Sequence, residues 1–217
     1  MELFGNVLTD SSQINYSLVK KYLERPLIKP RYRVSVLTPD EKVSYTIDEK
    51  DIAIDGINYT ESYQNGQRKN FSLKLINVDG KYTPSINGLW VNDRFRLDIG
   101  FETDNGEIIW FPKGIYIMGD STLDNSDSQK TVTIQMQDKY AIFEGKTGTL
   151  DTAYEIENGS NIYDALRGIL NFTMGNGYIM DYQDIIFDPS FYAQKTQSTI
   201  RVEQGDNLGS VINALAT

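Results

Sequence analysis

A period-two alternation of apolar and polar residues is the feature that most constrains this chain. It runs from Arg31 to about Gln137, in short segments that follow one another at roughly ten-residue spacing. The segments are rich in Val, Ile, Tyr and Thr, which fit the pleated, half-buried surface of a sheet. They read RYRVSVLT, KVSYTI, GINYTESY, KNFSLKLINV and RFRLDIGF. Short strands at this spacing predict a mainly β chain with minor α content (α+β), built as an antiparallel barrel or sandwich.

Turn signals separate the predicted strands. Asp104-Asn105-Gly106 is a strong hairpin signal, because Asn and Gly tolerate the positive φ that tight hairpin turns require. Further along, KGIYIMGD and KTVTIQMQ flank the polar stretch STLDNSDSQ, which predicts a solvated loop between two strands. The following DKYAIFEG predicts one short helical turn lying against the sheet.

The two ends of the chain differ from this central β domain, which we assign to residues 31–150. Residues 1–30 predict an N-terminal arm with a short helix, either docked on the domain or ordered on a neighbouring subunit. Residues 151–217 predict a C-terminal mixed α/β segment, which we interpret as the start of a second domain of a longer protein. The arm helix places three residues on one face: Ile14, Leu18 and Tyr22.

Two stretches of the C-terminal segment match at a fixed offset of 46 residues. IENGSNIYDALRGIL (156–170) and VEQGDNLGSVINALA (202–216) share an apolar residue, Glu, Gly, a polar residue, Asn and then apolar helix positions. This pattern predicts a strand, a tight Gly turn and a helix capped by Ser160 or Asp206. Two copies are too few for a repeat array. We interpret them as similar strand–turn–helix corners, with a duplication as the alternative.

The chain contains no His and no Cys. The missing His removes imidazole bases, Ser-His-Asp and Cys-His triads, and the commonest transition-metal ligand. The missing Cys removes disulfides and thiolate sites. The sequence also lacks the Gly-rich motifs that bind phosphates or dinucleotides. We therefore predict that the protein is not an enzyme, with no catalytic, cofactor-binding or metal-binding residues and no cofactor.

Carboxylates are the remaining candidates for chemistry. Asp120, Asp124 and Asp127 lie close together in DSTLDNSD (120–127), but they lack the alternate carboxylates, Gly and Glu of an EF-hand loop. A glycosidase needs two carboxylates at a set separation, and nothing in the sequence marks such a pair among 30 acidic residues. We expect a surface strand and turn for a second acidic stretch, which contains Asp48, Glu49, Asp51 and Asp55.

Aromatic residues suggest a carbohydrate-binding β-sandwich module as an alternative function. Trp90 and the Trp110-Phe111 pair could line a sugar-binding face. Neighbouring residues of a strand point to opposite faces, so we expect at least one of Trp110 and Phe111 in the core.

The net charge of −9, from 30 acidic and 21 basic residues, does not favour nonspecific DNA binding. No apolar run of about 18 residues is present, so we predict no membrane segment. The first residues, MELFGNVLTDSS, lack the basic and apolar regions of a signal peptide. We therefore expect synthesis in a cytoplasm.

The stretch FSLKLINVDGKYTPS (71–85) resembles a phrase in tail proteins of long-tailed bacteriophages. The phrase is a strand followed by Asn, any residue, Asp, Gly, a basic residue, an aromatic residue, Ser or Thr, and Pro. Three further segments look like those that follow it in the family: LWVNDRFRLDIGF, IIWFPKGIYIMGD and KTVTIQMQDKYAIFEG. VEQGDNLGSVINALA resembles the Gly-turn-helix that opens a later domain in baseplate or tail-tip hub proteins. The resemblance covers residues 31–150 and, more weakly, 151–217.

This resemblance implies a structural virion protein of a phage tail, a hub or baseplate ring subunit that connects the tail tube to the tail tip. It implies an antiparallel tube-like β-barrel, location in the virion and synthesis in the host cytoplasm. The implied partners are the chain itself in a symmetric ring (a trimer or hexamer), a tail tube or distal tail protein, and other baseplate proteins. DNA would pass through without specific binding, and an acidic lumen would keep it from adhering. The loop with Tyr82 and Pro84 would contact the next subunit. Host-surface carbohydrate binding is the alternative.

Overall fold

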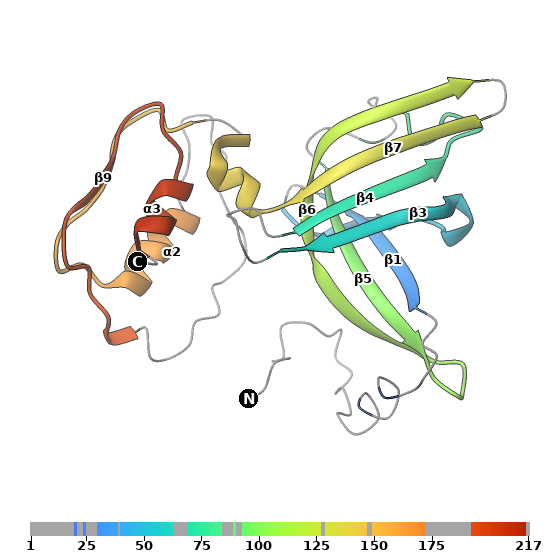
Figure 1. Cartoon of the computed structure of the whole chain (residues 1–217), viewed down its shortest axis with the longest axis horizontal. Coiled ribbons are helices and arrows are strands. Elements are labelled where there is room, and N and C mark those ends of the chain that lie inside the picture. Colours follow the sequence, from blue (N-terminus) through green and yellow to red (C-terminus); the bar gives the residue numbers. More distant parts are fainter. Residues whose placement is uncertain are drawn as a thin grey trace. The chain divides into compact units, whose positions relative to one another are not determined.

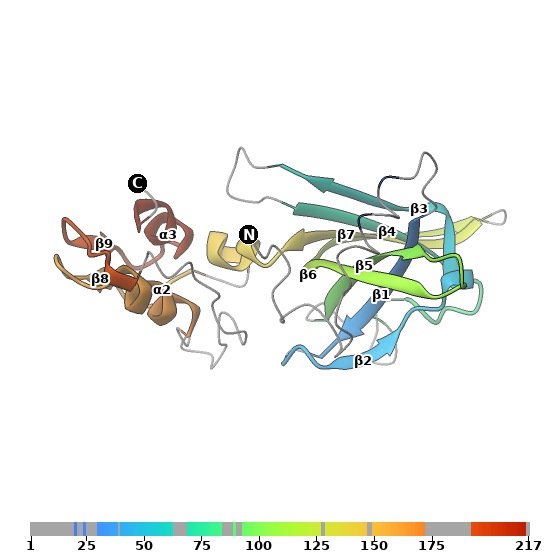
Figure 2. The ribbon, with the colours of Figure 1, turned by 90° about the horizontal axis from the view of Figure 1, so that it is seen from below.

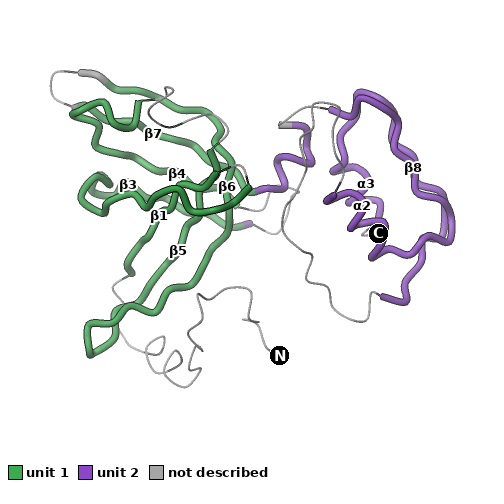
Figure 3. Tube along the Cα trace, turned by 180° about the vertical axis from the view of Figure 1, so that it is seen from behind, with its two compact units in different colours: residues 1–61, 69–138 green, residues 62–68, 139–217 purple. Residues whose placement is uncertain are grey.

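The computed structural model describes residues 20, 24, 30–38, 40–62, 69–83, 89, 93–126, 129–146, 149–171 and 192–215. The chain forms two compact units (Figure 3): unit 1 comprises residues 1–61 and 69–138, and unit 2 comprises residues 62–68 and 139–217. The predicted N-terminal helical arm lies almost wholly outside the described residues. Among the described residues of that helix, Glu24 N donates to Lys20 O at 3.1 Å and Lys20 Nζ lies 3.8 Å from Glu24 Oε1. These two contacts alone do not support the predicted arm helix.

Unit 1 is built on one antiparallel sheet of seven strands (Figure 1). In space their order is β2-β1-β5-β6-β7-β4-β3. This arrangement confirms the predicted mainly β, antiparallel architecture. The strands are β1 (Pro30–Leu37), β2 (Val43–Thr46), β3 (Ile52–Glu61), β4 (Lys69–Ile76), β5 (Arg94–Glu102), β6 (Ile108–Ser126) and β7 (Gln129–Asp138), and a 3-10 helix (Glu49–Asp51) precedes β3.

The sheet is open, so the predicted closed barrel is wrong for this chain. β2 and β3 are the two edge strands among the described residues. β2 has only four residues, all exposed. β3 carries a bulge between Ile52 and Ile57, where Asp55 has a φ of 55°. β2 and β3 stand at opposite ends of the strand order and do not pair with each other, so each leaves one side of its backbone unpaired within the described sheet.

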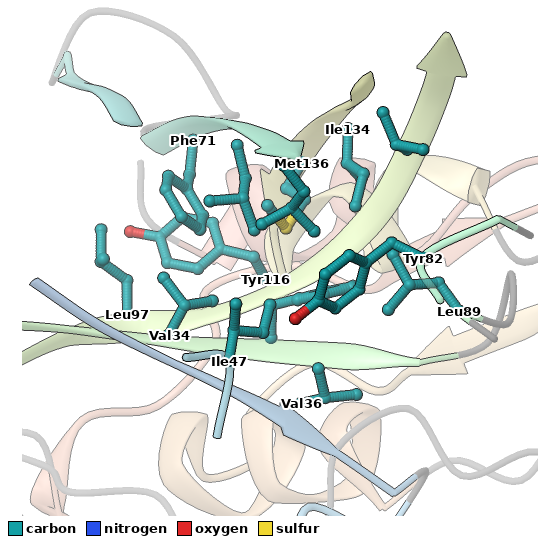
Figure 4. Packing of buried hydrophobic residues seen from close by; sticks show 14 residues of the cluster. Val34, Val36, Ile47, Phe71, Tyr82, Leu89, Leu97, Tyr116, Ile134 and Met136 are labelled. Atoms are coloured by element: carbon teal, nitrogen blue, oxygen red, sulfur yellow. The ribbon is translucent and has the colours of Figure 1, made fainter. Parts of the chain in front are cut away.

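The hydrophobic core lies inside the curve of this sheet. Figure 2 shows β3 and β4 on one side of unit 1 and β1 and β2 on the other. Alternate residues of β4 point inward, as its period-two pattern predicts: Phe71, Leu73 and Leu75 are all buried. Strands from both sides meet in the cluster of Figure 4, where the rings of Phe71 and Tyr116 lie 5.4 Å apart. Its other members include Val34, Val36, Phe95, Leu97, Val132, Ile134 and Met136.

The hairpin between β5 and β6 confirms the predicted turn at 104–106. Thr103 N donates to Glu107 O at 2.7 Å, and Gly106 has a φ of 81°. The next connection differs from the prediction. β6 continues through most of the polar stretch, and its residues pair with β7 as far as Ser126↔Gln129. Ser and Thr suit a strand that has one solvated face, so a polar composition did not indicate a loop here.

Unit 2 contains two short strands, β8 (Tyr154–Ile156) and β9 (Ile200–Val202), which pair antiparallel. Helix α2 (Ile162–Leu170) follows β8, and α3 (Gly209–Leu215) follows β9. The helical turn predicted for DKYAIFEG forms at Ile142–Lys146 and is interrupted by Gly145, which has a φ of 91°. The cap of α2 is Asn161, whose side chain accepts from Asp164 N, rather than the predicted Ser160. No helix in the described part of the chain could cross a membrane.

Candidate functional site

The loop that follows β4 is held by the side chain of Asn77. Asn77 Oδ1 accepts from Tyr82 N at 2.7 Å, and Asn77 Nδ2 donates to Thr83 Oγ1 at 2.9 Å. Asp79 Oδ1 accepts from Lys81 N at 3.2 Å, which is an Asx turn. Gly80 has a φ of 76°, a left-handed conformation that glycine adopts without steric cost. Asn77, Asp79 and Gly80 of the stretch FSLKLINVDGKYTPS therefore each stabilise the conformation of this loop.

The same loop is tied to the 3-10 helix by Asp51. The Tyr82 hydroxyl donates to Asp51 Oδ2 at 2.6 Å, and Lys81 Nζ lies 3.0 Å from the same oxygen. The hydrogen bond from Tyr82, and then that from Lys81, hold the pKa of Asp51 below its ordinary value. Burial, and then the bond to Asp51, raise the pKa of Tyr82 to about 12. At neutral pH the charged Asp51 carboxylate accepts hydrogen bonds from the neutral Tyr82 hydroxyl and from the Lys81 ammonium group.

Tyr82 is a core residue and not a surface contact. It is 1% exposed and belongs to the hydrophobic cluster of unit 1 (Figure 4). The expectation that Tyr82 contacts the next subunit is therefore wrong. A loop has no periodicity from which the burial of one aromatic residue could be predicted. Pro84, its partner in that expectation, lies outside the described residues.

Four exposed apolar residues lie toward one end of the sheet. The pairings Leu123↔Val132, Val132↔Leu75 and Leu75↔Ile52 align one row across β6, β7, β4 and β3. Large apolar residues at or beyond this row are open to solvent, and Ile54, on the bulge of β3, is 95% exposed. The four residues of this apolar end are Ile54, Ile76, Val78 and Leu123.

The opposite edge of the sheet also exposes apolar side chains. On β2, Val43 is 54% exposed and Tyr45 is 38% exposed. β2 pairs with β1 along one side, through Ser35↔Thr46, Val36↔Tyr45 and Leu37↔Val43. As an edge strand, β2 presents backbone groups on its other side that can pair with another chain.

The carboxylates of the acidic stretch at 48–55 are mostly engaged in ion pairs. Asp48 lies 2.9 Å from Lys50, Glu49 lies 2.8 Å from Arg31, and Asp51 binds Lys81 as above. These pairs agree with the predicted surface strand and turn. Asp120 and Asp124 lie in β6, whereas Asp127 is outside the described residues. Among described residues no group of three His, Cys, Asp or Glu side chains could hold a metal ion.

The aromatic pair of β6 is divided between the two faces of the sheet. Trp110 pairs with Gly100 and Phe111 pairs with Ile99. Both are half-buried, so the expectation that one of them lies in the core is wrong. The Arg33 guanidinium lies 4.6 Å from the Trp110 ring, and the ring leaves no room for a Cβ at Gly100. Trp110 is thus packed against Arg33 and Gly100. Trp90 lies outside the described residues.

Two buried charge clusters escaped the sequence analysis. The Asp98 side chain is 1% exposed and receives Arg33 Nε at 2.9 Å and Arg96 Nε at 3.1 Å. Glu41 and Arg94 form an ion pair in which both side chains are buried. The alternation of RFRLDIGF places its charged residues together on one face, which was the available signal. Their partners lie on β1 and in the β1–β2 turn, and spacing alone does not reveal them.

No family model matches the sequence, and no curated protein matches it. Among solved structures, the chain is similar to chains in complexes of PdpA with VgrG. The lidless complex gives a TM-score of 0.41 at 16% identity, over 83% of this chain and 29% of that one. The lidded Francisella complex gives 0.43 at 16% identity, over 89% and 25%. The half-lidded Francisella complex gives 0.40 at 16% identity, over 90% and 29%. This chain therefore spans less than a third of those chains.

Proposed function

We propose that this chain is a structural subunit of a phage tail, a hub or baseplate ring subunit that joins the tail tube to the tail tip. It acts by assembly and not by catalysis. The observation that carries the proposal is the pair of unlike edges on one open sheet. One edge is β2, with Val43 and Tyr45 exposed, and the other is β3, with Ile54 exposed. A surface with two different edges suits head-to-tail contacts, which close into a ring when the rotation between copies permits it.

In such a ring, β2 of one copy pairs with β3 of the next copy. Backbone hydrogen bonds supply affinity, and the exposed apolar residues near both edges are buried. The partners are further copies of the chain in a trimer or hexamer, a tail tube or distal tail protein, and other baseplate proteins. DNA passes through without specific binding, in keeping with the acidic balance of the chain. The protein is made in the host cytoplasm and resides in the virion.

The edge variant Val43→Lys/Tyr45→Lys tests this assembly. Lysine on an edge strand opposes edge-to-edge pairing, and both side chains are already exposed, so unit 1 remains folded. The matched control is Gln135→Lys, because Gln135 is exposed on the central strand β7. Light scattering with size-exclusion chromatography gives the mass, and electron microscopy at high protein concentration gives the shape. We expect rings with a central channel for the parent chain and the control, and monomers for the edge variant.

A parent chain that stays monomeric at every concentration, or rings that survive the edge variant, would refute the β2–β3 contact. The loop beyond Tyr82 is tested separately by replacing residues 84–88 with a Gly/Ser linker. This replacement retains the buried Tyr82, so a loss of rings reports on contacts and not on the core. If the linker variant still forms rings, these residues take no part in assembly.

A further inference from the structure

The pairing of β8 with β9 is centred on two residues that the 46-residue offset relates. The central pair is Glu155↔Arg201, and 155 plus 46 is 201. The flanking pairs, Tyr154↔Val202 and Ile156↔Ile200, change places under the same offset. An antiparallel pair of strands with this register has a two-fold axis through its central pair. Figure 2 shows β8 and β9 together within unit 2. The strands that lead into the two matched stretches are therefore paired with each other.

The turns that follow the two strands repeat the same geometry. Gly159 has a φ of 82° and Gly205 a φ of 92°. Ser160 N donates to Glu157 O at 3.2 Å, and Asp206 N donates to Glu203 O at 3.2 Å. All three positions are related by the offset of 46. Both turns therefore use a left-handed glycine in the same place and close with the same backbone hydrogen bond.

Each turn is also held by the backbone of the opposite half. Gly159 N donates to Thr196 O at 3.0 Å, and Thr196 N donates to Ser160 O at 2.9 Å. In the other half, Gly205 N donates to Leu150 O at 2.9 Å, and Leu150 N donates to Asp206 O at 2.8 Å. Leu150 and Thr196 are 46 residues apart, and both are buried. The equivalence therefore extends six residues before the start of the sequence match.

We propose that residues 150–170 and 196–215 are two copies of one strand–turn–helix half, related by a pseudo-two-fold axis. Glu155 and Arg201 are the residue pair that makes each copy pair with the other copy rather than with itself. In a self-paired half, the central residue would face its own equivalent. Glu155 would then face Glu155 of a second chain, or Arg201 would face Arg201, and like charges opposite each other are destabilising. In this chain Arg201 Nη1 lies 3.4 Å from Glu155. Arg201 Nε also lies 2.9 Å from Glu203.

Charge reversal tests the axial pair, with hydrogen exchange at the Leu150, Gly159, Thr196 and Gly205 amides as the readout. Exposed ion pairs contribute modestly, so we expect Glu155→Arg or Arg201→Glu to speed exchange by about three- to tenfold at all four amides. Because residue 201 also lies beside Glu203, the double variant Glu155→Arg/Arg201→Glu additionally carries Glu203→Gln. It restores opposite charges at the axis and should return the rates to within about twofold of the Glu203→Gln chain. Single variants without effect, or a double variant as fast as the singles, would overturn the role of this pair.

Exchanging the two turns tests the equivalence of the copies. Asn158→Gln/Ser160→Asp places the turn of the second copy in the first, and Gln204→Asn/Asp206→Ser does the reverse. We expect both swaps to leave the four exchange rates within about twofold of the parent chain. The contrast is Gly159→Val, which puts a β-branched residue at positive φ and should speed exchange at Leu150 and Gly205 as well as at Thr196. The duplication is refuted if a swap speeds exchange as much as Gly159→Val does. The idea that each turn is held by the opposite copy is refuted if Gly159→Val speeds exchange at Thr196 but not at Leu150 and Gly205. Tryptophan fluorescence of unit 1 should stay unchanged in all variants, since Trp90 and Trp110 both lie there.

Discussion

The hydroxyl of Tyr82 offers the sharpest test of how the loop after β4 is held. Replacing Tyr82 by Phe keeps the buried ring and removes only the 2.6 Å hydrogen bond to Asp51. A hydrogen bond to a charged group contributes about 1.5–3 kcal/mol. Asp51 retains Lys81, and its side chain is 20% exposed, so water replaces part of the lost bond. We therefore expect the free energy of unfolding of unit 1 to fall by about 1–2 kcal/mol at pH 7.

A second variant at the same position measures how much the packing of the Tyr82 aromatic ring contributes to the free energy of unfolding. Tyr82→Ala also empties a site that is 1% exposed, and truncating a buried aromatic residue costs about 3–5 kcal/mol. The matched control is Tyr45→Phe, on the exposed strand β2, which should change stability by less than about 0.5 kcal/mol. Urea denaturation followed by tryptophan fluorescence measures unit 1, because both Trp residues belong to it.

The pH dependence of the Tyr82→Phe effect distinguishes this hydrogen bond from a change in packing. Asp51 has a lowered pKa in the folded chain. Its contribution is therefore present above the unfolded value of about 3.9 and is lost as pH falls through the folded value. Tyr82 has a pKa raised to about 12. Its contribution is present below about 10 and is lost as pH rises toward the folded value. The gap between parent and variant should be widest between these limits; a gap that is the same at every pH, or absent at pH 7, would refute the reasoning.

Two further predictions concern buried groups of unit 1, both measured by the same urea denaturation. Arg94→Met removes the guanidinium that pairs with the buried Glu41 side chain and should lower the free energy of unfolding by about 3–5 kcal/mol. Arg94→Met/Glu41→Met should recover much of that loss, because it replaces both charged side chains by apolar ones. A double variant no more stable than the single one would contradict this. Gly56→Ala brings a Cβ to 2.6 Å from Ala53 O and Lys74 O. Since both are backbone atoms, we expect the free energy of unfolding to fall by about 2–3 kcal/mol. The control Asn58→Ala, on the exposed side of β3, should lower it by less than about 0.5 kcal/mol.

Alternation predicts strands well where one face is buried and the other solvated. β4 follows it residue by residue, because Phe71, Leu73 and Leu75 enter the core while Ser72 and Lys74 do not. The outer part of β6 shows the limit of this signal. There Asp120 and Asp124 lie in a strand, although their surroundings are polar enough to suggest a loop. The composition of a segment indicates how buried it is. A solvated strand differs from a loop in its backbone pairing, which composition does not show.

Closure of the sheet depends on the two edges, and local sequence says little about them. The bulge of β3 rests on Asp55 at positive φ and on Gly56 packed against the backbone of β4. Gly in a strand pattern is compatible with a bulge, but it does not say how far the edge is displaced. The burial of Tyr82 is a similar case. Its motif could be recognised from the sequence, yet the partner at Asp51 lies 31 residues away.

The duplication proposed for unit 2 accounts for a sequence match that ends before the structural equivalence does. The hydrogen bonds that hold each turn to the opposite copy use only backbone atoms, and every non-proline residue has those. Leu150 and Thr196 can therefore make the same bonds without resembling each other. Glu155 and Arg201 occupy the axis, where a self-paired copy would place like charges opposite each other. A repeat joined by backbone bonds thus leaves a faint trace in sequence. Its register is more informative, because a symmetric register centred on residues 46 apart is not expected from two unrelated strands.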